Sequence, residues 1–224
     1  WGVPRLTDKQ RRLGVRVNPK RVRRLCREGK LLLTRRRGRK RAAVVRAPRV
    51  VPTGPNQRWS MDFVHDRLAD GRPFRVLTVL DEGTRKSPAH VVGRSLTGQH
   101  VVAALEQLAQ TRGLPRTISV DNGAEFTSRA LDVWAEQRGV HLDFIRPGKP
   151  NDNAFIESFN SRLRDECLNE HYFTSLVDAQ VKIERFRLDY LTEHSHSSLG
   201  GLTPAEYAAR FTPSAPAELT RLSA

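Results

Sequence analysis

Cysteine is scarce in this sequence, and long apolar stretches are absent. Only Cys26 and Cys167 occur among 224 residues, which excludes a disulfide framework and a cysteine-rich zinc module and is typical of the reducing cytoplasm. No run of about 18 apolar residues is present, so no transmembrane helix is predicted. The first residues lack the apolar segment of a signal peptide and an initiator methionine, as would a fragment, a processed chain or the downstream part of a longer product.

Acidic residues are rare in the first 50 positions. This segment holds 19 of the 39 Lys and Arg residues but 2 of the 24 Asp and Glu residues, a net charge of +17. Residues 51–224 carry a net charge of −2. Such a basic segment favours a polyanionic partner, and nucleic acid is the first candidate. An anionic membrane is the second, but the segment has no aromatic residue beyond Trp1 and no wide apolar face.

Two short helices are predicted within residues 1–33. We expect Thr7 to cap the first helix, because Gln10 follows three residues later as in a capping box. Gly14 can end this helix in a left-handed conformation. The second helix is expected to begin after Asn18, a good capping residue, and to end near a glycine.

The second helix combines one apolar face with many basic residues. Val22, Leu25 and Cys26 recur at helical spacing and form the apolar face. The candidate DNA-contacting residues cover the rest of the helix: Lys20, Arg21, Arg23, Arg24 and Arg27. Two short helices joined by a tight turn resemble part of a helix-turn-helix, whose second helix reads the DNA groove. A solvated basic helix pair on a protein surface is the alternative.

Residues 56–210 are predicted to form an α/β domain with the element order βββαβαβαα. The expected strands cover 58–66, 72–82, 87–95, 116–121 and 140–146, and the expected helices cover 98–112, 128–138, 153–171 and 177–194. Short turns separate the first three strands, which predicts an antiparallel meander. A basic linker with three prolines precedes this domain over 34–55, either as a plain connector or as a tether along a phosphate backbone, and a polar tail follows over 211–224.

Three acidic residues occupy special places in this order. Asp62 lies in the first strand, Asp121 ends the fourth strand, and Glu157 lies in the first turns of the helix after the fifth strand. If the first and fourth strands are neighbours, these side chains converge at one edge of the sheet. Clustered carboxylates repel one another unless cations neutralise them, and two Mg²⁺ ions are the preferred solution.

Each of these acids also has an ordinary structural interpretation. Asp121 precedes Asn-Gly and can be a turn residue, Asp62 can cap a backbone group, and Glu157 can be a solvated helix residue. The joint arrangement favours the metal site. Glu157 shares a helix face with Asn153, Asn160 and Arg164, beside the apolar stripe, so it borders the core without being buried.

Four stretches resemble the IS3-type insertion-sequence transposases (the second-frame protein), whose catalytic core is similar to that of retroviral integrases. They are WSMDF (59–63), SVDNGAEF (119–126), RPGKPNDNAFIESFNSRLRDECLNE (146–170) and HSSLGGLTPAEY (196–207). Residues 1–30 resemble the C-terminal part of the helix-turn-helix that precedes this core in the family. The resemblance covers nearly the whole chain, and the 146–170 stretch is its most specific part.

The resemblance implies an RNase H-like fold, a five-stranded mixed sheet flanked by helices, preceded by a small helical segment. It implies that Asp62, Asp121 and Glu157 form a DDE triad that holds two Mg²⁺ ions, for which Mn²⁺ can substitute. Further residues that match the family's substrate-contacting positions are Lys149, Asn153 and Arg164.

The implied activity is cleavage and transfer of DNA strands at the ends of a mobile element. The implied partners are the element's terminal inverted repeats, target DNA and further copies of this chain, at least a dimer on paired ends. The implied location is the bacterial cytoplasm, at the nucleoid.

The chain departs from the family pattern near its last long helix. Leu191, His194 and Ser195 stand where the family often has Asn, Arg and Pro. These differences leave open a catalytically decayed or co-opted transposase that only binds DNA. A metal-dependent ribonuclease or resolvase on the same fold is another alternative, against which the basic helix pair argues.

Overall fold

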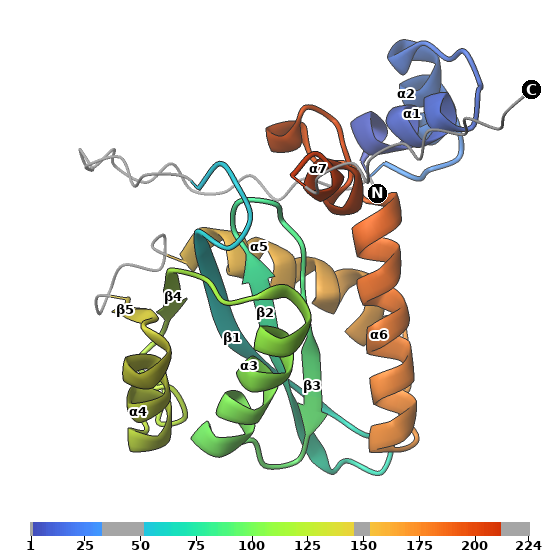
Figure 1. Cartoon of the computed structure of the whole chain (residues 1–224). Helices are drawn as coiled ribbons and strands as arrows, with labels where there is room; N and C mark the ends of the chain where they lie inside the picture. Colours follow the sequence, from blue (N-terminus) through green and yellow to red (C-terminus); the bar gives the residue numbers. More distant parts are fainter. Residues whose placement is uncertain (1, 33–51, 146–152, 212–224) are drawn as a thin grey trace, which may run out of the picture.

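The structure is a computed structural model that describes residues 2–32, 52–145 and 153–211 (Figure 1). Most of the predicted linker, the tail after Phe211, and Lys149 lie outside these ranges. The predicted domain boundaries therefore stay predictions. Within these ranges, no helix is long and apolar enough to cross a membrane.

One five-stranded mixed sheet forms the centre of the molecule. Its strands lie in the order β3-β2-β1-β4-β5. Their bounds are Arg58–Arg67 for β1, Pro73–Asp81 for β2, His90–Gly93 for β3, Thr117–Val120 for β4 and His141–Phe144 for β5. The first three strands pair antiparallel, whereas β4 and β5 run parallel to β1. The predicted meander and the predicted contact between the first and fourth strands are confirmed.

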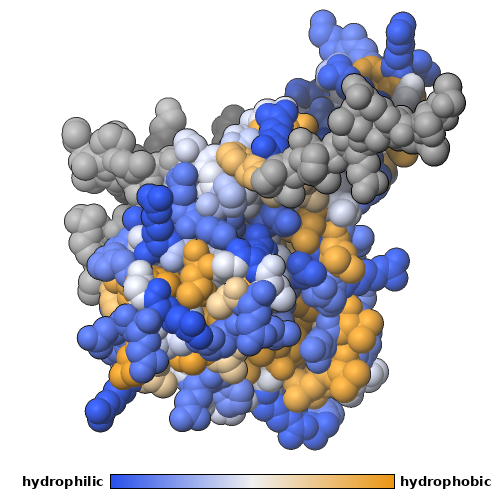
Figure 2. Space-filling view, viewed as in Figure 1, coloured by the Kyte–Doolittle hydropathy of each residue, from blue (hydrophilic) through white to orange (hydrophobic). Residues whose placement is uncertain are grey.

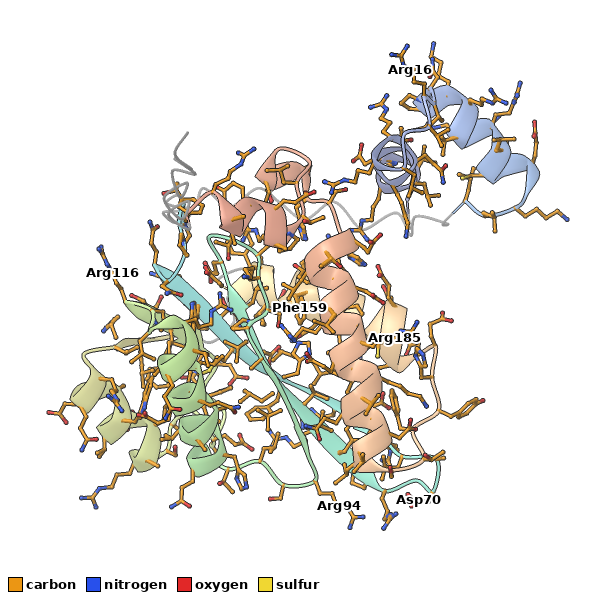
Figure 3. The ribbon with its side chains drawn as sticks, turned by 45° about the vertical axis from the view of Figure 1, so that its right-hand side comes forward. Arg16, Asp70, Arg94, Arg116, Phe159 and Arg185 are labelled. Carbon is orange, nitrogen blue, oxygen red and sulfur yellow. The ribbon has the colours of Figure 1, made fainter. Side chains whose placement is uncertain are left out.

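Helices cover both faces of the sheet, which makes a three-layered α/β fold (Figure 1). Four long helices do this: α3 (Gly98–Arg112), α4 (Arg129–Arg138), α5 (Ala154–Leu163) and α6 (Leu176–Glu193). One core contains Trp59 and Met61 of β1 with buried residues of α3 and α4. The other contains Val64 of β1 with residues of α5 and α6, among them Phe159, which lies between the sheet and α6 in Figure 3. Because side chains alternate along a strand, Asp62 shares the face of Val64 and points toward α5.

The single helix expected over 153–171 is wrong in one respect. The α-helical part ends at Leu163, and a π-helical turn, η2 (Arg164–Leu168), continues it. The amide of Asn169 bonds to the carbonyl of Arg164 at 2.9 Å, five residues back, so the last turn is wider than an α-helical turn. Two short helical elements that were not predicted from the sequence follow α6, namely η3 (Ser197–Leu199) and α7 (Pro204–Ala209).

The N-terminal segment forms two helices, α1 (Val3–Arg12) and α2 (Pro19–Glu28). Asn18 caps α2 as predicted, since its side chain accepts a hydrogen bond from the amide of Lys20 at 2.9 Å. The predicted cap at Thr7 is wrong, because α1 begins four residues earlier and the Thr7 hydroxyl donates to the carbonyl of Val3. The predicted apolar face is also narrower, because Leu25 is 51% exposed.

Helix α1 docks on the core through a row of ion pairs to η2, the end of α6 and α7. The pairs are Arg5 with Glu166 at 3.3 Å, Lys9 with Glu193 at 3.1 Å and Arg12 with Glu206 at 2.7 Å. The Arg5–Glu166 pair is half-buried, whereas the other two are largely exposed, and exposed pairs contribute at most about 1 kcal/mol each. Their row nevertheless fixes which face of α1 meets the core.

Candidate active site

The register between β1 and β4 sets two of the predicted acids side by side. Ser60 pairs with Ser119 in the parallel ladder. Two residues further along each strand are Asp62, still within β1, and Asp121, immediately after β4 ends at Val120. Neighbouring parallel strands advance together, so both carboxylates reach the same edge of the sheet.

A hydrogen bond joins Asp62 to the helix that carries Glu157. The Asn160 side-chain amide donates to Oδ2 of Asp62 at 2.8 Å, and the amide of Phe63 donates to Oδ1 at 2.7 Å. The Thr78 hydroxyl donates to Oδ1 of Asn160 at 2.9 Å, which fixes the orientation of that amide. Glu157 lies three residues before Asn160 on the same helix face; Glu157 is exposed and Asn160 is half-buried. The sequence placed Asn160 on this face but gave it no partner.

Asp62 lies within the electrostatic reach of both other acids. Burial raises the pKa of Asp62 above its ordinary value, and the negative charges of Asp121 and Glu157 raise it further. Hydrogen bonds from Phe63 and Asn160 act in the opposite direction. A cation at this edge of the sheet would relieve the repulsion among the three carboxylates.

The chemistry of these side chains fits a hard divalent cation, because carboxylate oxygens are the ligands that Mg²⁺ prefers. In the arrangement described for residues 2–32, 52–145 and 153–211, no three His, Cys, Asp or Glu side chains form a ready metal-binding group. Both carboxylate oxygens of Asp62 instead accept hydrogen bonds from N–H groups. The three acids therefore supply the negative charge and the ligand type that a divalent cation needs, but in this arrangement they do not form a ready metal-binding group.

The loop after β4 holds Asp121 through short local contacts. Oδ1 of Asp121 accepts a hydrogen bond from the amide of Gly123 at 2.9 Å, and the Asn122 side chain donates to the carbonyl of Ile145 at 3.0 Å. A Cβ atom at Gly123 would lie 2.9 Å from Oδ1 of Asp121, so a larger residue would displace the carboxylate. This explains the glycine two residues after the acid.

An ion pair that was not predicted from the sequence connects the same loop to strand β2. Arg75 of β2 pairs with Glu125, and its guanidinium lies 4.1 Å from the centre of the Phe63 ring. Phe63 in turn stacks on Phe126 at 5.2 Å. Phe126 is 1% exposed and so belongs to the core. No periodicity signals a pair 50 residues apart, which only the sheet brings together.

The predicted DNA-contacting residues fall into two groups. Figure 2 shows hydrophilic side chains projecting from the helix pair α1 and α2. All five basic side chains of α2 are exposed: Lys20, Arg21, Arg23, Arg24 and Arg27. In the core, Arg164 is exposed and its Nη2 donates to the carbonyl of His65 at 3.4 Å, beside the strand that carries Asp62. Asn153 directly precedes α5 and is 5% exposed, so its side chain is less accessible than the others.

Sequence comparisons connect the chain to bacterial mobile elements. Two family models described as integrase core domain match residues 52–150 and 138–204. The chain is 45% identical to the insertion element IS407 uncharacterized 31.7 kDa protein of Burkholderia multivorans, over 99% of this chain and 81% of that protein. It is 44% identical to the IS476 uncharacterized 39.2 kDa protein of Xanthomonas euvesicatoria, of which it spans 61%. It is 27% identical to the transposase InsF for insertion sequence IS3A of Escherichia coli, over 92% of this chain and 76% of that protein.

Comparison with solved structures identifies the fold. A chain in the simian T-cell lymphotropic virus intasome, in complex with PP2A regulatory subunit B56 gamma, matches with a TM-score of 0.65 and 14% identity, over 93% of this chain and 73% of that one. The HTLV-2 integrase catalytic core domain in complex with magnesium matches with a TM-score of 0.56 and 16% identity, over 70% of this chain and 99% of that one. These likenesses show an RNase H-like fold. Together with the sequence relatives, they show that the chain belongs to the IS3-type insertion-sequence transposases with an integrase core, a family of polynucleotidyl transferases.

Proposed function

We propose that this transposase binds the ends of its own mobile element and catalyses metal-dependent DNA strand cleavage and strand transfer. Asp62, Asp121 and Glu157 are the proposed catalytic residues. The observation that carries the proposal is the placement of Asp62 and Asp121 at matching positions of two parallel strands, within electrostatic reach of Glu157. Three separate elements thereby direct negative charge to one edge of the sheet.

The three carboxylates are also the proposed ligands of two Mg²⁺ ions, which Mn²⁺ can replace. The carboxylate oxygens of these three residues would hold the ions at this edge of the sheet. When bound, such ions lower the pKa of an attacking hydroxyl and stabilise the departing 3′ oxygen. Asn160 and Thr78 hold the Asp62 carboxylate in orientation.

The chain's part in the chemistry is to hold the acids and to position the DNA. The nucleophile would be water in the first step, which frees a 3′-OH at the element's end, and that 3′-OH in the second. Arg164, whose guanidinium bonds to the carbonyl of His65 in β1, would hold a phosphate of the substrate strand. The exposed basic residues of α2 would hold the flanking duplex through its phosphates.

Joining two DNA ends needs both ends in one complex. We therefore propose an assembly of at least two copies of this chain on paired ends, formed on the DNA. Sizing of the free chain and of its complex with end DNA tests this, because strand joining by a demonstrable monomer on one end contradicts it.

The decisive experiment is cleavage of DNA that carries the element's ends, with Mg²⁺, by the full chain and by Asp62→Asn and Asp121→Asn. Both variants keep the shape of the side chain but lose its charge, so cleavage should stop while DNA binding and the circular dichroism spectrum are retained. Asp189→Asn, which removes an exposed acid of α6, is the matched control and should cleave normally. Cleavage by either triad variant above a few per cent would exclude that residue as a metal ligand. DNA binding without cleavage by the unaltered chain would favour the decayed transposase.

A further inference from the structure

A hollow lined by arginines lies on the other side of α5 from the acidic triad. This hollow of about 720 Å³ opens where α1, α5, α6 and the segment 195–198 meet. Ser158 and Arg162 of α5 line this hollow. Glu157, which belongs to the triad, and Asn160, which bonds to Asp62, lie on the other side of the helix. At 100° per residue these two pairs lie on roughly opposite sides of the helix. The volume lies within the roughly 300–1,000 Å³ typical of small-molecule sites.

Three arginines from separate parts of the chain line this hollow: Arg5 of α1, Arg85 of the loop after β2, and Arg162 of α5. Arg85 is the most unusual. It is 8% exposed, and its Nη1 atom has no hydrogen-bond partner among the described residues. Its guanidinium lies 3.6 Å from the centre of the Phe155 ring, which also lines the hollow. A buried guanidinium nitrogen without a partner is costly, and such a group in a native structure calls for a missing ligand or another explanation.

The backbone conformation of Arg85 is a second indication of a ligand site. Its φ angle is 59°, in the left-handed region that side chains other than glycine rarely adopt. Conformations of this kind persist where the surrounding structure imposes them, and they gather at ligand-binding and active sites. The strained loop therefore presents one particular side chain, a guanidinium, to the wall of the hollow.

Positive charge exceeds negative charge around the hollow. Glu166 is paired with Arg5 and with His194, and Asp8 accepts a hydrogen bond from Ser195. Arg162 has the neutral hydroxyl of Tyr190 as a hydrogen-bond partner. Asp81, at the end of β2, and Glu82, which follows it, raise the pKa of Arg85 by their charges, but both are fully buried and neither lines the hollow.

The positive charge of the arginines affects the pKa of His196, another residue that lines the hollow. Burial lowers the pKa of His196 to about 3, and the charges of Arg162, Arg5, His194 and Arg85 lower it further. His196 is therefore neutral at pH 7 and does not add to the positive charge. The hollow is nonetheless electropositive enough to disfavour another cation.

We propose that this hollow binds the phosphate group of a nucleotide, with Arg85 and Arg162 as its ligands. The planar guanidinium group donates paired hydrogen bonds that match phosphate oxygens. The hydroxyls of Ser158 and Ser198 add donors at the wall, and Phe155 offers an apolar surface. The phosphate comes from a free nucleoside phosphate or from a DNA strand. Arg5 of α1 lines the same hollow, so a bound phosphate would lie at the junction between the basic segment and the core.

Calorimetric titration of the full chain in EDTA tests this site apart from strand transfer, because the triad needs metal ions. The probes are inorganic pyrophosphate, dAMP, and a short oligonucleotide with either a 5′-phosphate or a 5′-hydroxyl. Saturable binding of dAMP and pyrophosphate identifies a free nucleoside phosphate. Tighter binding of the phosphorylated oligonucleotide alone identifies a strand phosphate. No saturable binding of dAMP or pyrophosphate, with equal affinity for the two oligonucleotides, overturns the proposal.

Two variants connect the binding to this hollow. Arg162→Gln should weaken it by about tenfold, the worth of one charged hydrogen bond, whereas Arg185→Gln, an exposed arginine of α6, should change it less than about twofold. Ser198→Glu should abolish binding by placing a carboxylate in the wall, and Ser198→Gln, of equal size, should not. If Arg162→Gln fails to fold, the Ser198 pair decides. Equal affinity of Ser198→Glu and Ser198→Gln overturns the proposal.

Discussion

Nε2 of His194 lies 2.9 Å from Oε2 of Glu166, and Oε1 of the same carboxylate lies 3.3 Å from Arg5 of α1. His194 is one of the three positions at which the chain departs from its family's pattern. The other two also have defined contacts, since Leu191 is buried and the Ser195 hydroxyl donates to Asp8 at 3.4 Å. Two of the departures, His194 and Ser195, therefore contribute to the junction between α1 and the core, and Leu191 belongs to the hydrophobic core.

Glu166→Gln should loosen this junction. The substitution removes the negative charge that Arg5 pairs with and changes the partner of Nε2 of His194, whose side chain is 2% exposed. We expect a loss of about 1–2 kcal/mol in the free energy of unfolding and faster amide exchange over 3–12. Glu170→Gln, an exposed acid just beyond the π-helical turn, is the control. Unchanged exchange in α1 would show that Glu166 does not hold the helix.

Asn160→Ala should raise the Mg²⁺ concentration that DNA cleavage requires. Asn160 positions the Asp62 carboxylate, and loss of such supporting hydrogen bonds typically costs about 10–100-fold in metal affinity or activity. A Mg²⁺ titration of cleavage measures the shift, and Asn169→Ala, on an exposed residue, is the matched control. The same Mg²⁺ midpoint in Asn160→Ala and in the unaltered chain would contradict a positioning role.

The sequence predicted the sheet better than it predicted the contacts of the site. The alternation of Trp59 and Met61, with short turns between strands, predicted the antiparallel meander. The position of Asp121 at the end of the fourth strand predicted the edge of the sheet at which the acids meet. The partners of those acids depend instead on how α5 packs against the sheet. Asn160 reaches Asp62 across 98 residues of sequence, a contact that no local pattern encodes.

Helix ends were predicted where one residue decides them and missed where several compete. Asn18 offers its side chain to a nearby amide whatever surrounds it, so its cap was predictable. Thr7 could cap a helix or lie inside one. The chain takes the second course because Pro4 suits a first helical turn, and the helix begins before it.

Stability should fall as the pH is lowered from 7 toward 4.5, in part because of His90. Burial, then the charge of Arg187, lowers the pKa of His90 to about 3, against the opposing charge of Glu184. The unfolded chain binds a proton near pH 6.5 and the folded chain does not until about pH 3, so protonation favours unfolding throughout this window. His196, whose pKa is also about 3, acts in the same direction.

His90→Gln keeps a partner for the Ser87 hydroxyl, which lies 3.1 Å from Nε2 of His90, but removes the titration. We expect the loss of unfolding free energy between pH 7 and 4.5 to shrink by on the order of 2 kcal/mol in this variant. Urea unfolding at the two pH values measures it, with His141→Gln on the exposed end of β5 as control. An unchanged pH dependence would mean that His90 is not buried as a neutral group.

Neutralising α2 should reduce DNA affinity and its dependence on salt. The triple variant Arg21→Gln, Arg23→Gln and Arg27→Gln removes three exposed charges from the helix proposed to contact DNA. Each lost phosphate contact lowers the slope of log K against log salt by about 0.9, so the slope should fall by about 2–3. Arg24 is left in place because it pairs with Glu28 at 3.5 Å.

The matched control removes the same net charge from the core. Three exposed arginines serve for it: Arg94, Arg129 and Arg185, replaced together by Gln. A long-range effect of net charge would lower affinity equally in both triple variants, whereas direct contact lowers the slope only in the α2 variant. Filter binding or fluorescence anisotropy with end DNA and with unrelated DNA, at several salt concentrations, separates the two. If α2 also reads bases, as its resemblance to a recognition helix predicts, selectivity for the element's ends should also fall in the α2 variant. Equal slopes for the two variants would show that α2 is not the surface that binds DNA.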